Sequence, residues 1–366
     1  MKKNRKLLIG IGIVVLLGFV WVGVYNNWSH VSDSNAIHIG AFFPLTGNLA
    51  NQGRNVANAF LLAGEDVNES YGKKKYVMDL CDTKADPKVA GLIVQQLINS
   101  PSKPAMIFSL VSSAVLHIQP MTEKNQIVLF GFVGTDNLFD SSPKLTYRGM
   151  PSALQIGVSA THALRDDLKV HDVLILYPNT AYGLGYGKAV ERECKANGVR
   201  VFGSYAYEEN ASGYANFIVS VDARKATSIF LTGAGDNLGV MLKVIRESGY
   251  EGPILCDLNL TPTIVKNSHA SLKNLYMLDY ASPRGDRYQV FSKKYAERFG
   301  KEPDPLAVIC YELFCVYDKA KQELGESVWN DSSAIEGWHY ESMLGTINVK
   351  NQEIIIPLEV RNVSVK

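Results

Sequence analysis

Small polar residues follow short apolar segments of the chain at points where a helix is expected to begin. Leu110-Val-Ser112-Ser follows residues 105–109, and Val-Gly134-Thr135-Asp follows residues 127–131. Hydroxyls and free backbone N–H groups at a helix N-terminus suit a carboxylate, because the positive end of the helix dipole lies there. Ser112 and Thr135 could equally be simple helix caps, and the spacing alone does not separate the two interpretations.

Two further strand ends carry different chemistry. Thr180-Ala-Tyr182-Gly follows residues 172–177, and Asp257 ends the apolar segment 254–257. An aromatic ring at one end can cover a small ligand, and a carboxylate at the other can accept hydrogen bonds from an ammonium group. These ends therefore predict a second binding wall that complements the first.

Motifs for covalent chemistry are missing from the sequence. It contains no G-x-S-x-G elbow, no P-loop and no H-E-x-x-H pair, and its seven histidines are scattered. Ser100-x-x-Lys103 lacks its partner motifs, and Gly183-Leu-Gly185-Tyr-Gly187 has the wrong spacing for a dinucleotide fingerprint. We expect no enzyme, no cofactor and no metal site.

The elements that must position these residues alternate between short apolar runs and amphipathic stretches, as in a parallel α/β sheet. The alternation runs once through the first part of the chain and starts again near residue 172, which predicts two similar α/β units. Ligands of such sheets bind at the carboxyl ends of the strands. The expected strands are 37–43, 76–80, 105–109, 127–131, 172–177, 199–203, 228–232 and 254–257, with a strand or hairpin at 353–363, and the later helices are 188–196, 238–246, 288–299 and 306–324.

The net charge, the charges near the N-terminus and the cysteine content limit which partners and which cellular compartment fit this chain. Lys and Arg total 37 against 36 for Asp and Glu, so no overall field attracts nucleic acid. Four basic residues within the first six precede an uncharged run at 7–25, which predicts export and leaves residues 1–36 open as a cleaved signal peptide or a membrane anchor. The five cysteines form no paired spacing, and we expect buried thiols.

Several strings, in order, resemble the branched-chain amino-acid-binding family of type I periplasmic solute-binding proteins of ABC transporters. These strings are Ile39-Gly-Ala-Phe-Phe-Pro44-Leu-Thr-Gly47 with Gly53, Asp86-Pro-Lys88, Thr180-Ala-Tyr-Gly-Leu-Gly185, Gly198-Val, and Tyr295-Ala-Glu-Arg-Phe-Gly-Lys-Glu-Pro303-Asp304 before Tyr311. The resemblance implies two Rossmann-like lobes joined by three crossovers, which close on a ligand in the cleft between them. Residues 37–153 and 282–338 would form the first lobe, and residues 154–281 and 339–366 the second.

The resemblance also implies roles for individual residues. Ser112 and Thr135, with Gly134 beside them, would hold the ligand carboxylate; Tyr182 would cover the ligand, and a carboxylate at or next to Asp257 would bind its ammonium. Leu110 belongs to the same first-lobe strand end as Ser112. The implied partners are a small molecule and an ABC permease.

Three departures from the family pattern affect the expected ligand. Gln52 replaces an aromatic residue of the first loop, Ala234 with nearby Asp236 replaces another, and Ala85 stands where a cysteine is expected. Leucine or valine is therefore a doubtful ligand, and an amino acid or a related small amide or carboxylate is expected. An anchored ligand sensor, contacting another membrane protein, is the alternative to a transport receptor.

Overall fold

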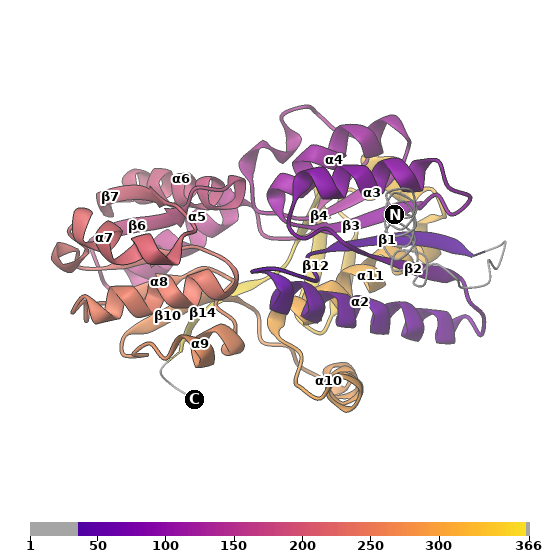
Figure 1. Ribbon diagram of the computed structural model, residues 1–366. Coiled ribbons are helices and arrows are strands. Elements are labelled where there is room, and N and C mark those ends of the chain that lie inside the picture. Colours follow the sequence, from indigo (N-terminus) through magenta and orange to yellow (C-terminus); the bar gives the residue numbers. More distant parts are fainter. Residues whose placement is uncertain (1–35, 364–366) are drawn as a thin grey trace, which may run out of the picture.

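The computed structural model describes residues 36–363, which form two α/β lobes side by side (Figure 1). The sheet of the first lobe has the order β11-β12-β13-β5-β4-β3-β1-β2, and that of the second has the order β14-β10-β9-β8-β6-β7. The first sheet consists of β1 (Ile37–Phe43), β2 (Tyr76–Asp82), β3 (Met106–Leu110), β4 (Val128–Phe132), β5 (Thr146–Arg148), β11 (His339–Ser342), β12 (Gly345–Lys350) and β13 (Glu353–Ile355). The second consists of β6 (Asp172–Pro178), β7 (Arg200–Tyr207), β8 (Ile229–Leu231), β9 (Ile254–Cys256), β10 (Leu275–Tyr280) and β14 (Leu358–Asn362).

Helices cover both sheets. The first lobe carries α2 (Ala50–Ser70), α3 (Pro87–Ile98), α4 (Ser112–Lys124), α10 (Asp286–Phe299) and α11 (Pro305–Leu324), and the second carries α5 (Ala153–His162), α6 (Ala181–Ala196), α7 (Tyr214–Ser220), α8 (Gly235–Glu247) and α9 (Pro262–Ser268). Central strands such as β3 and β4 are buried along their whole length, as parallel strands between two helical layers must be. Asp86 and Asp304 cap α3 and α11 ahead of a proline, which fixes where these helices begin. The predicted two-unit α/β fold is confirmed.

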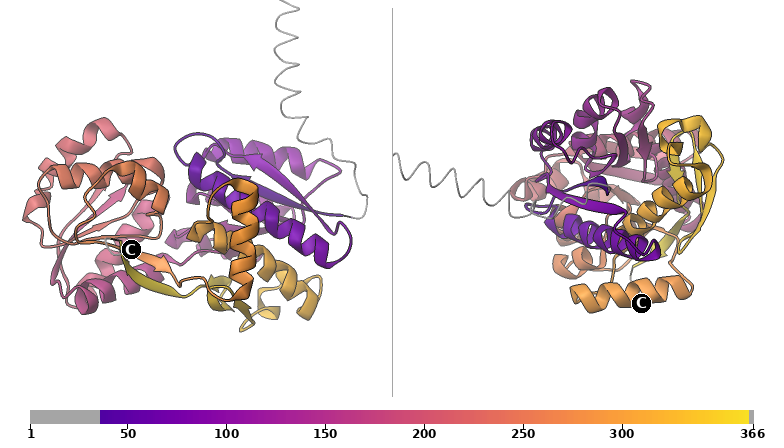
Figure 2. Two further views of the ribbon diagram at one scale, coloured as in Figure 1. Left: turned by 90° about the horizontal axis from the view of Figure 1, so that it is seen from below. Right: turned by 90° about the vertical axis from the view of Figure 1, so that its right-hand side faces the viewer.

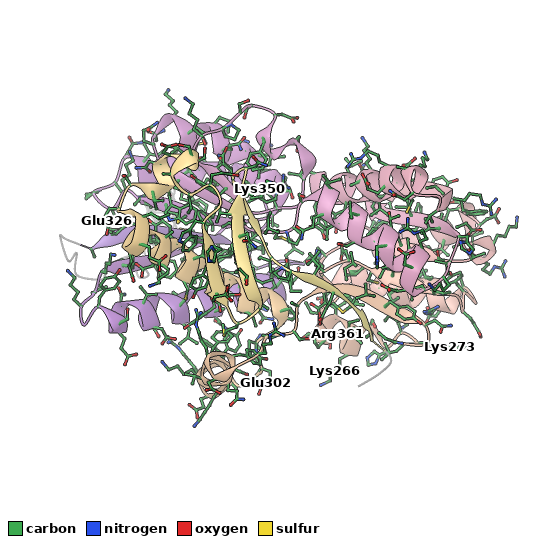
Figure 3. All side chains as sticks on the ribbon, turned by 180° about the vertical axis from the view of Figure 1, so that it is seen from behind. Lys266, Lys273, Glu302, Glu326, Lys350 and Arg361 are labelled. Atoms are coloured by element: carbon green, nitrogen blue, oxygen red, sulfur yellow. The ribbon has the colours of Figure 1, made fainter. Side chains whose placement is uncertain are left out.

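Three segments join the lobes. The chain passes from β5 to α5 through residues 149–152, from β10 to α10 through residues 281–285, and from β13 to β14 through Ile356 and Pro357. Figure 2 shows that these connections lie on one side of the molecule, between the lobes. Figure 3 follows the last of them from behind, from Lys350 in the first lobe to Arg361 in the second. Short connections of this kind allow the lobes to rotate as rigid bodies.

The C-terminal assignment from the sequence is wrong in part. Residues 339–366 were expected in the second lobe, but β11, β12 and β13 extend the sheet of the first, and only β14 joins the second. The reason is strand pairing: β12 pairs with β13, β13 pairs with β5 at Glu353 and Arg148, and Ile347, Val349 and Ile354 are buried there. The expected strand or hairpin at 353–363 is accordingly divided between the two sheets.

The predicted signal or anchor lies outside the described residues, apart from Ala36. Within residues 36–363 no helix is long and apolar enough to span a bilayer. The five cysteines are free thiols, four of them buried and Cys315 partly so, as expected from their spacing.

Candidate functional site

A cavity of about 180 Å³ lies between the lobes. An engineered cavity of roughly 150 Å³ is large enough for benzene, so this space suits a ligand with a small body. The first lobe contributes Leu49, Gln52, Ala85, Leu110, Val111, Ser112, Ser113, Phe132, Met150 and Leu306, and the second contributes Pro178, Thr180, Ala181, Tyr182, Glu209, Ala234 and Asn259. Strand ends of both sheets therefore meet at the cavity, where ligands of open α/β sheets bind.

Ser112 is the first residue of α4 and lines the cavity. Its side chain is buried, and its hydroxyl has no hydrogen-bond partner. The N-cap position belongs to Val111, whose side chain cannot accept a hydrogen bond, so Ser112 is not a helix cap. Val111 has a φ of 82°, a conformation that a β-branched residue rarely adopts and that is typical of functional sites. The turn therefore places the N-terminal end of α4, with Val111, Ser112 and Ser113, in the lining of the cavity.

Gln52 on α2 provides a second unpartnered donor on the same wall. Its side chain is only 5% exposed, and Nε2 has no hydrogen-bond partner. A buried donor without a partner costs about 1–3 kcal/mol, so two of them beside one cavity indicate a binding site for a group that accepts hydrogen bonds.

Thr135 and Gly134 do not line the cavity. The Thr135 hydroxyl lies 2.5 Å from Asn137 Oδ1, to which it donates, and the Thr135 carbonyl accepts from Arg148 Nη1 at 2.8 Å. A Cβ added to Gly134 would lie 1.9 Å from Cε1 of Tyr186 in the second lobe. Gly134 therefore allows the lobes to approach, and Thr135 is held by internal contacts.

Tyr182, in the first turn of α6, forms much of the second wall. Thr180 caps this helix by accepting from the Gly183 N–H at 3.1 Å. The Tyr182 ring lies 4.5 Å from the Tyr186 ring, and Tyr186 in turn donates to the Pro151 carbonyl of the first crossover at 3.0 Å. The ring at the cavity is thus linked through Tyr186 to the hinge.

Asp257 lies behind this wall and does not line the cavity. Its carboxylate accepts from the Tyr182 hydroxyl at 2.5 Å, from the Thr232 hydroxyl, and from the backbone N–H groups of Gly233 and Asn259 at 3.4 and 3.0 Å. Burial raises the pKa of Asp257 to about 6, and the hydrogen bonds oppose that rise. The carboxylate is already supplied with four donors, so it positions Tyr182 and Asn259.

Asp236 is also separate from the main cavity. It is an exposed residue in the first turn of α8, beside a space of about 10 Å³ between α2 and α8. Such a volume holds about one water molecule at most. The structure therefore brings Ser112, Leu110, Gln52 and Tyr182 together at the cavity, and it leaves Asp236, Asp257, Gly134 and Thr135 outside.

Two polar residues at the cavity were not identified from the sequence. Asn259 comes two residues after Asp257, and its Nδ2 donates to the Tyr182 hydroxyl at 2.8 Å and to the Gly233 carbonyl at 3.0 Å. Glu209 follows β7, which extends to Tyr207 although the apolar pattern predicted a strand ending at 203. Ligands of parallel α/β sheets bind at the carboxyl ends of the strands. A prediction that extended this strand to Tyr207 would therefore have identified Glu209 as a candidate.

The cavity offers hydrogen bonds and apolar surface. Its lining includes no His, Lys or Cys that could act as base or nucleophile beside Ser112. Among residues 36–363, no group of His, Cys, Asp and Glu is arranged to hold a metal ion. Leu110, Phe132, Met150 and Leu306 supply the apolar surface on the first lobe.

Comparison with known proteins gives a consistent result. A family model described as "Periplasmic binding protein" matches residues 36–354. Leu/Ile/Val-binding protein homolog 8 of Brucella abortus is 21% identical over 287 residues, covering 73% of this chain and 71% of that protein. A leucine-binding protein of Thermotoga maritima superposes with a TM-score of 0.78 at 19% identity, covering 90% of this chain and 95% of the other. An ABC transporter solute-binding protein of Rhodopseudomonas palustris, in complex with 3,4-dihydroxybenzoic acid, gives 0.76 at 19% identity, covering 90% and 93%.

Proposed function

Because the chain belongs to the periplasmic binding protein family, in its branched-chain amino-acid-binding group, we propose that it is an extracytoplasmic receptor for a small carboxylate ligand. Of the ligand classes expected from the sequence, the proposed ligand is an amino acid or another small carboxylate and not a small amide; the receptor delivers this ligand to an ABC permease. The observation that carries this proposal is the buried, unpartnered hydroxyl of Ser112 at the N-terminus of α4.

A ligand carboxylate would satisfy every unpaired donor on the first wall. The Ser112 hydroxyl, the Gln52 amide and the first N–H groups of α4 all require an acceptor. Hydrogen bonds to a charged group contribute about 1.5–3 kcal/mol, which exceeds the value of a neutral pair. The positive end of the helix dipole adds to the preference for an anion.

The apolar wall and the relatives support the same ligand class. Leu110, Phe132, Met150 and Leu306 form a surface for a small hydrocarbon or aromatic body. Leucine and 3,4-dihydroxybenzoic acid, named for two structures of the same fold, both carry a carboxylate on such a body. The apolar parts of these two ligands differ, so the carboxylate is the shared feature on which we base the proposed ligand of this chain.

Two close approaches between the lobes support closure around the ligand. Gly134 in the first lobe meets the Tyr186 ring, and Gly235 in the second lobe meets Asn48, whose carbonyl would lie 2.7 Å from an added Cβ. Each contact depends on a glycine and joins the two lobes near the cavity. Hinge closure that brings these surfaces together would enclose a bound ligand.

A membrane-anchored sensor is the second candidate function. The uncharged run at 7–25 is long enough to cross a bilayer as a helix, and it follows basic residues. Mass measurement of the mature N-terminus separates the two: retention of this run favours the sensor, and its removal favours the transport receptor.

A thermal-shift screen of the purified protein tests the proposed function. Amino acids, small carboxylic acids and small amides would be added one at a time. A carboxylate that binds the folded state raises the melting temperature by mass action, and the Ser112→Ala protein should show a smaller rise. Stabilisation by amides alone, with no response to any carboxylate, would contradict the proposal.

A further inference from the structure

Glu209 is the one acidic side chain among the described residues that line the cavity. It follows β7 in the second lobe, and its carboxylate has no hydrogen bond or ion pair with any of residues 36–363. Its side chain is exposed to solvent on one side. Partial burial against the protein on the other side disfavours the charged form and raises the pKa of the carboxyl group. An unpaired carboxylate beside a ligand cavity is a candidate partner for a cationic group.

Asp257 cannot take this role. Two hydroxyls and two backbone N–H groups already donate to its carboxylate, and it lies behind Tyr182 and Asn259. An ammonium group would have to displace these donors within a fully buried site. The role of cation partner therefore falls on a residue that lines the cavity.

The second wall provides acceptors where the first provides donors. Both hydrogens of the Asn259 amide are used, by the Tyr182 hydroxyl and the Gly233 carbonyl, which leaves Oδ1 as an acceptor. Together with Glu209, this oxygen makes the second wall complementary to a hydrogen-bond donor on the ligand. The first wall, with Ser112 and Gln52, is complementary to an acceptor.

We propose that Glu209 is the specificity-determining residue that selects ligands carrying an ammonium group in addition to the carboxylate. The ammonium would approach Glu209 and Asn259 Oδ1 while the carboxylate meets the N-terminus of α4. This inference rests on the proposed function, because it assumes that a carboxylate ligand binds between the lobes. It assigns to the loop after β7 the contact that the sequence placed at Asp257.

The test measures affinity by calorimetry for amino acids paired with their deaminated acids. The pairs are L-leucine and isocaproate, L-valine and isovalerate, L-alanine and propionate, and L-phenylalanine and hydrocinnamate. Glu209→Gln should weaken the amino acid that binds by roughly tenfold to a hundredfold and leave its deaminated acid within about twofold. Glu208→Gln is the matched control: Glu208 accepts from Asn179 Nδ2 at 2.8 Å and does not line the cavity, so neither ligand should be affected.

The outcomes separate this inference from the proposed function. If Glu209→Gln weakens both members of a pair equally, or if the wild-type protein binds only deaminated acids, Glu209 does not select an ammonium and the receptor function stands. If no member of any pair binds the wild-type protein, both proposals are contradicted. Loss of amino-acid binding in the Glu208→Gln protein would also overturn the inference, since a general charge effect would then explain the result.

Discussion

The strand ends after β3 and after β9 both carry polar groups to the cleft, yet they differ in how those groups are satisfied. After β3, Ser112 is buried with no partner, and Val111 adopts an unfavourable backbone conformation. After β9, Asp257 is fully buried and accepts four hydrogen bonds. A buried polar group without a partner lacks an interaction that a ligand can supply, whereas a satisfied group holds its neighbours in place.

The comparison teaches that residue type alone does not identify a ligand contact. A carboxylate has more binding capacity than a hydroxyl, and by that criterion Asp257 is the stronger candidate. Its hydrogen bonds are used within the second lobe, however, and only Tyr182 and Asn259 in front of it line the cavity. The two strand ends should therefore respond differently to mutation: one through affinity, the other through stability.

The largest expected effect is on affinity at the first strand end. Ser112→Ala should weaken a carboxylate ligand by about 1.5–3 kcal/mol, because it removes a hydrogen bond to a charged group. The melting temperature without ligand should stay the same or rise slightly, since the hydroxyl has no partner to lose. Calorimetry and thermal unfolding measure the two quantities; a lowered melting temperature with unchanged affinity would remove the distinction between the strand ends.

At the second strand end the expected effect is on pH-dependent stability. Burial raises the pKa of Asp257 from 3.8 to about 6, so the folded state binds this proton more tightly than the unfolded state. The resulting stabilisation is present below about pH 4 and is lost as the pH rises through about 6, with an upper magnitude of about 3 kcal/mol. Asp257→Asn should remove the part of the pH dependence of stability that comes from Asp257. Denaturant unfolding at a series of pH values between about 4 and about 6 measures this change.

Asp279 provides a matched control for this measurement. Burial raises its pKa to about 6 as well, against the attraction of Arg361, whose Nη1 lies 2.9 Å from Oδ2. Asp279 is outside the cavity lining, so Asp279→Asn should remove a similar share of the pH dependence. An Asp257→Asn protein with the pH profile of the wild type would show that Asp257 does not titrate as its burial requires.

Tyr182→Phe tests whether the second wall is positioned by Asp257. The change removes a hydroxyl that donates to Asp257 and accepts from Asn259, and it should lower the free energy of unfolding by about 1 kcal/mol. Affinity should fall by a similar amount for amine and amine-free ligands alike, because the hydroxyl orients the wall. A selective loss of amine ligands would instead indicate direct contact between this hydroxyl and the ammonium.

Thr135→Val should have the smallest effect on binding. Its hydroxyl donates to Asn137 and does not line the cavity, so the change should cost about 1 kcal/mol of stability and leave affinity within about twofold. The same two measurements apply as for Ser112→Ala. A loss of affinity equal to that of Ser112→Ala would place Thr135 in the binding site and show that the two hydroxyls act alike.

The sequence predicts much of the fold because the hydrophobic pattern is strong where parallel strands are buried. The strand at 37–43 is found at its expected bounds. Ser112 lines the cavity, and its role as a ligand contact stays a prediction. The lobe to which β11–β13 belong could not be predicted, because the alternation of exposed and less exposed residues in β11 and β12 shows that one face is covered but not which sheet the strands extend.

The remaining differences between the sequence-based expectations and the structure concern contacts between distant segments. Gly134 was taken for a ligand residue, but its role depends on the Tyr186 ring, which comes from the other lobe. Asp257 was taken for a free carboxylate, but its donors include Thr232 and Tyr182, each from a different strand end. Whether the hydrogen-bonding capacity of a carboxylate is already used depends on the tertiary structure. It cannot be inferred from the neighbouring sequence.

The most direct test of the binding mode compares one ligand in two forms. The carboxylate that gives the largest thermal shift and its primary amide differ by one charge and have nearly the same shape. Calorimetry on the wild-type protein should show the carboxylate binding at least tenfold more tightly, and Ser112→Ala should reduce that preference. Equal affinity of the wild-type protein for the two forms would contradict a carboxylate site at the N-terminus of α4.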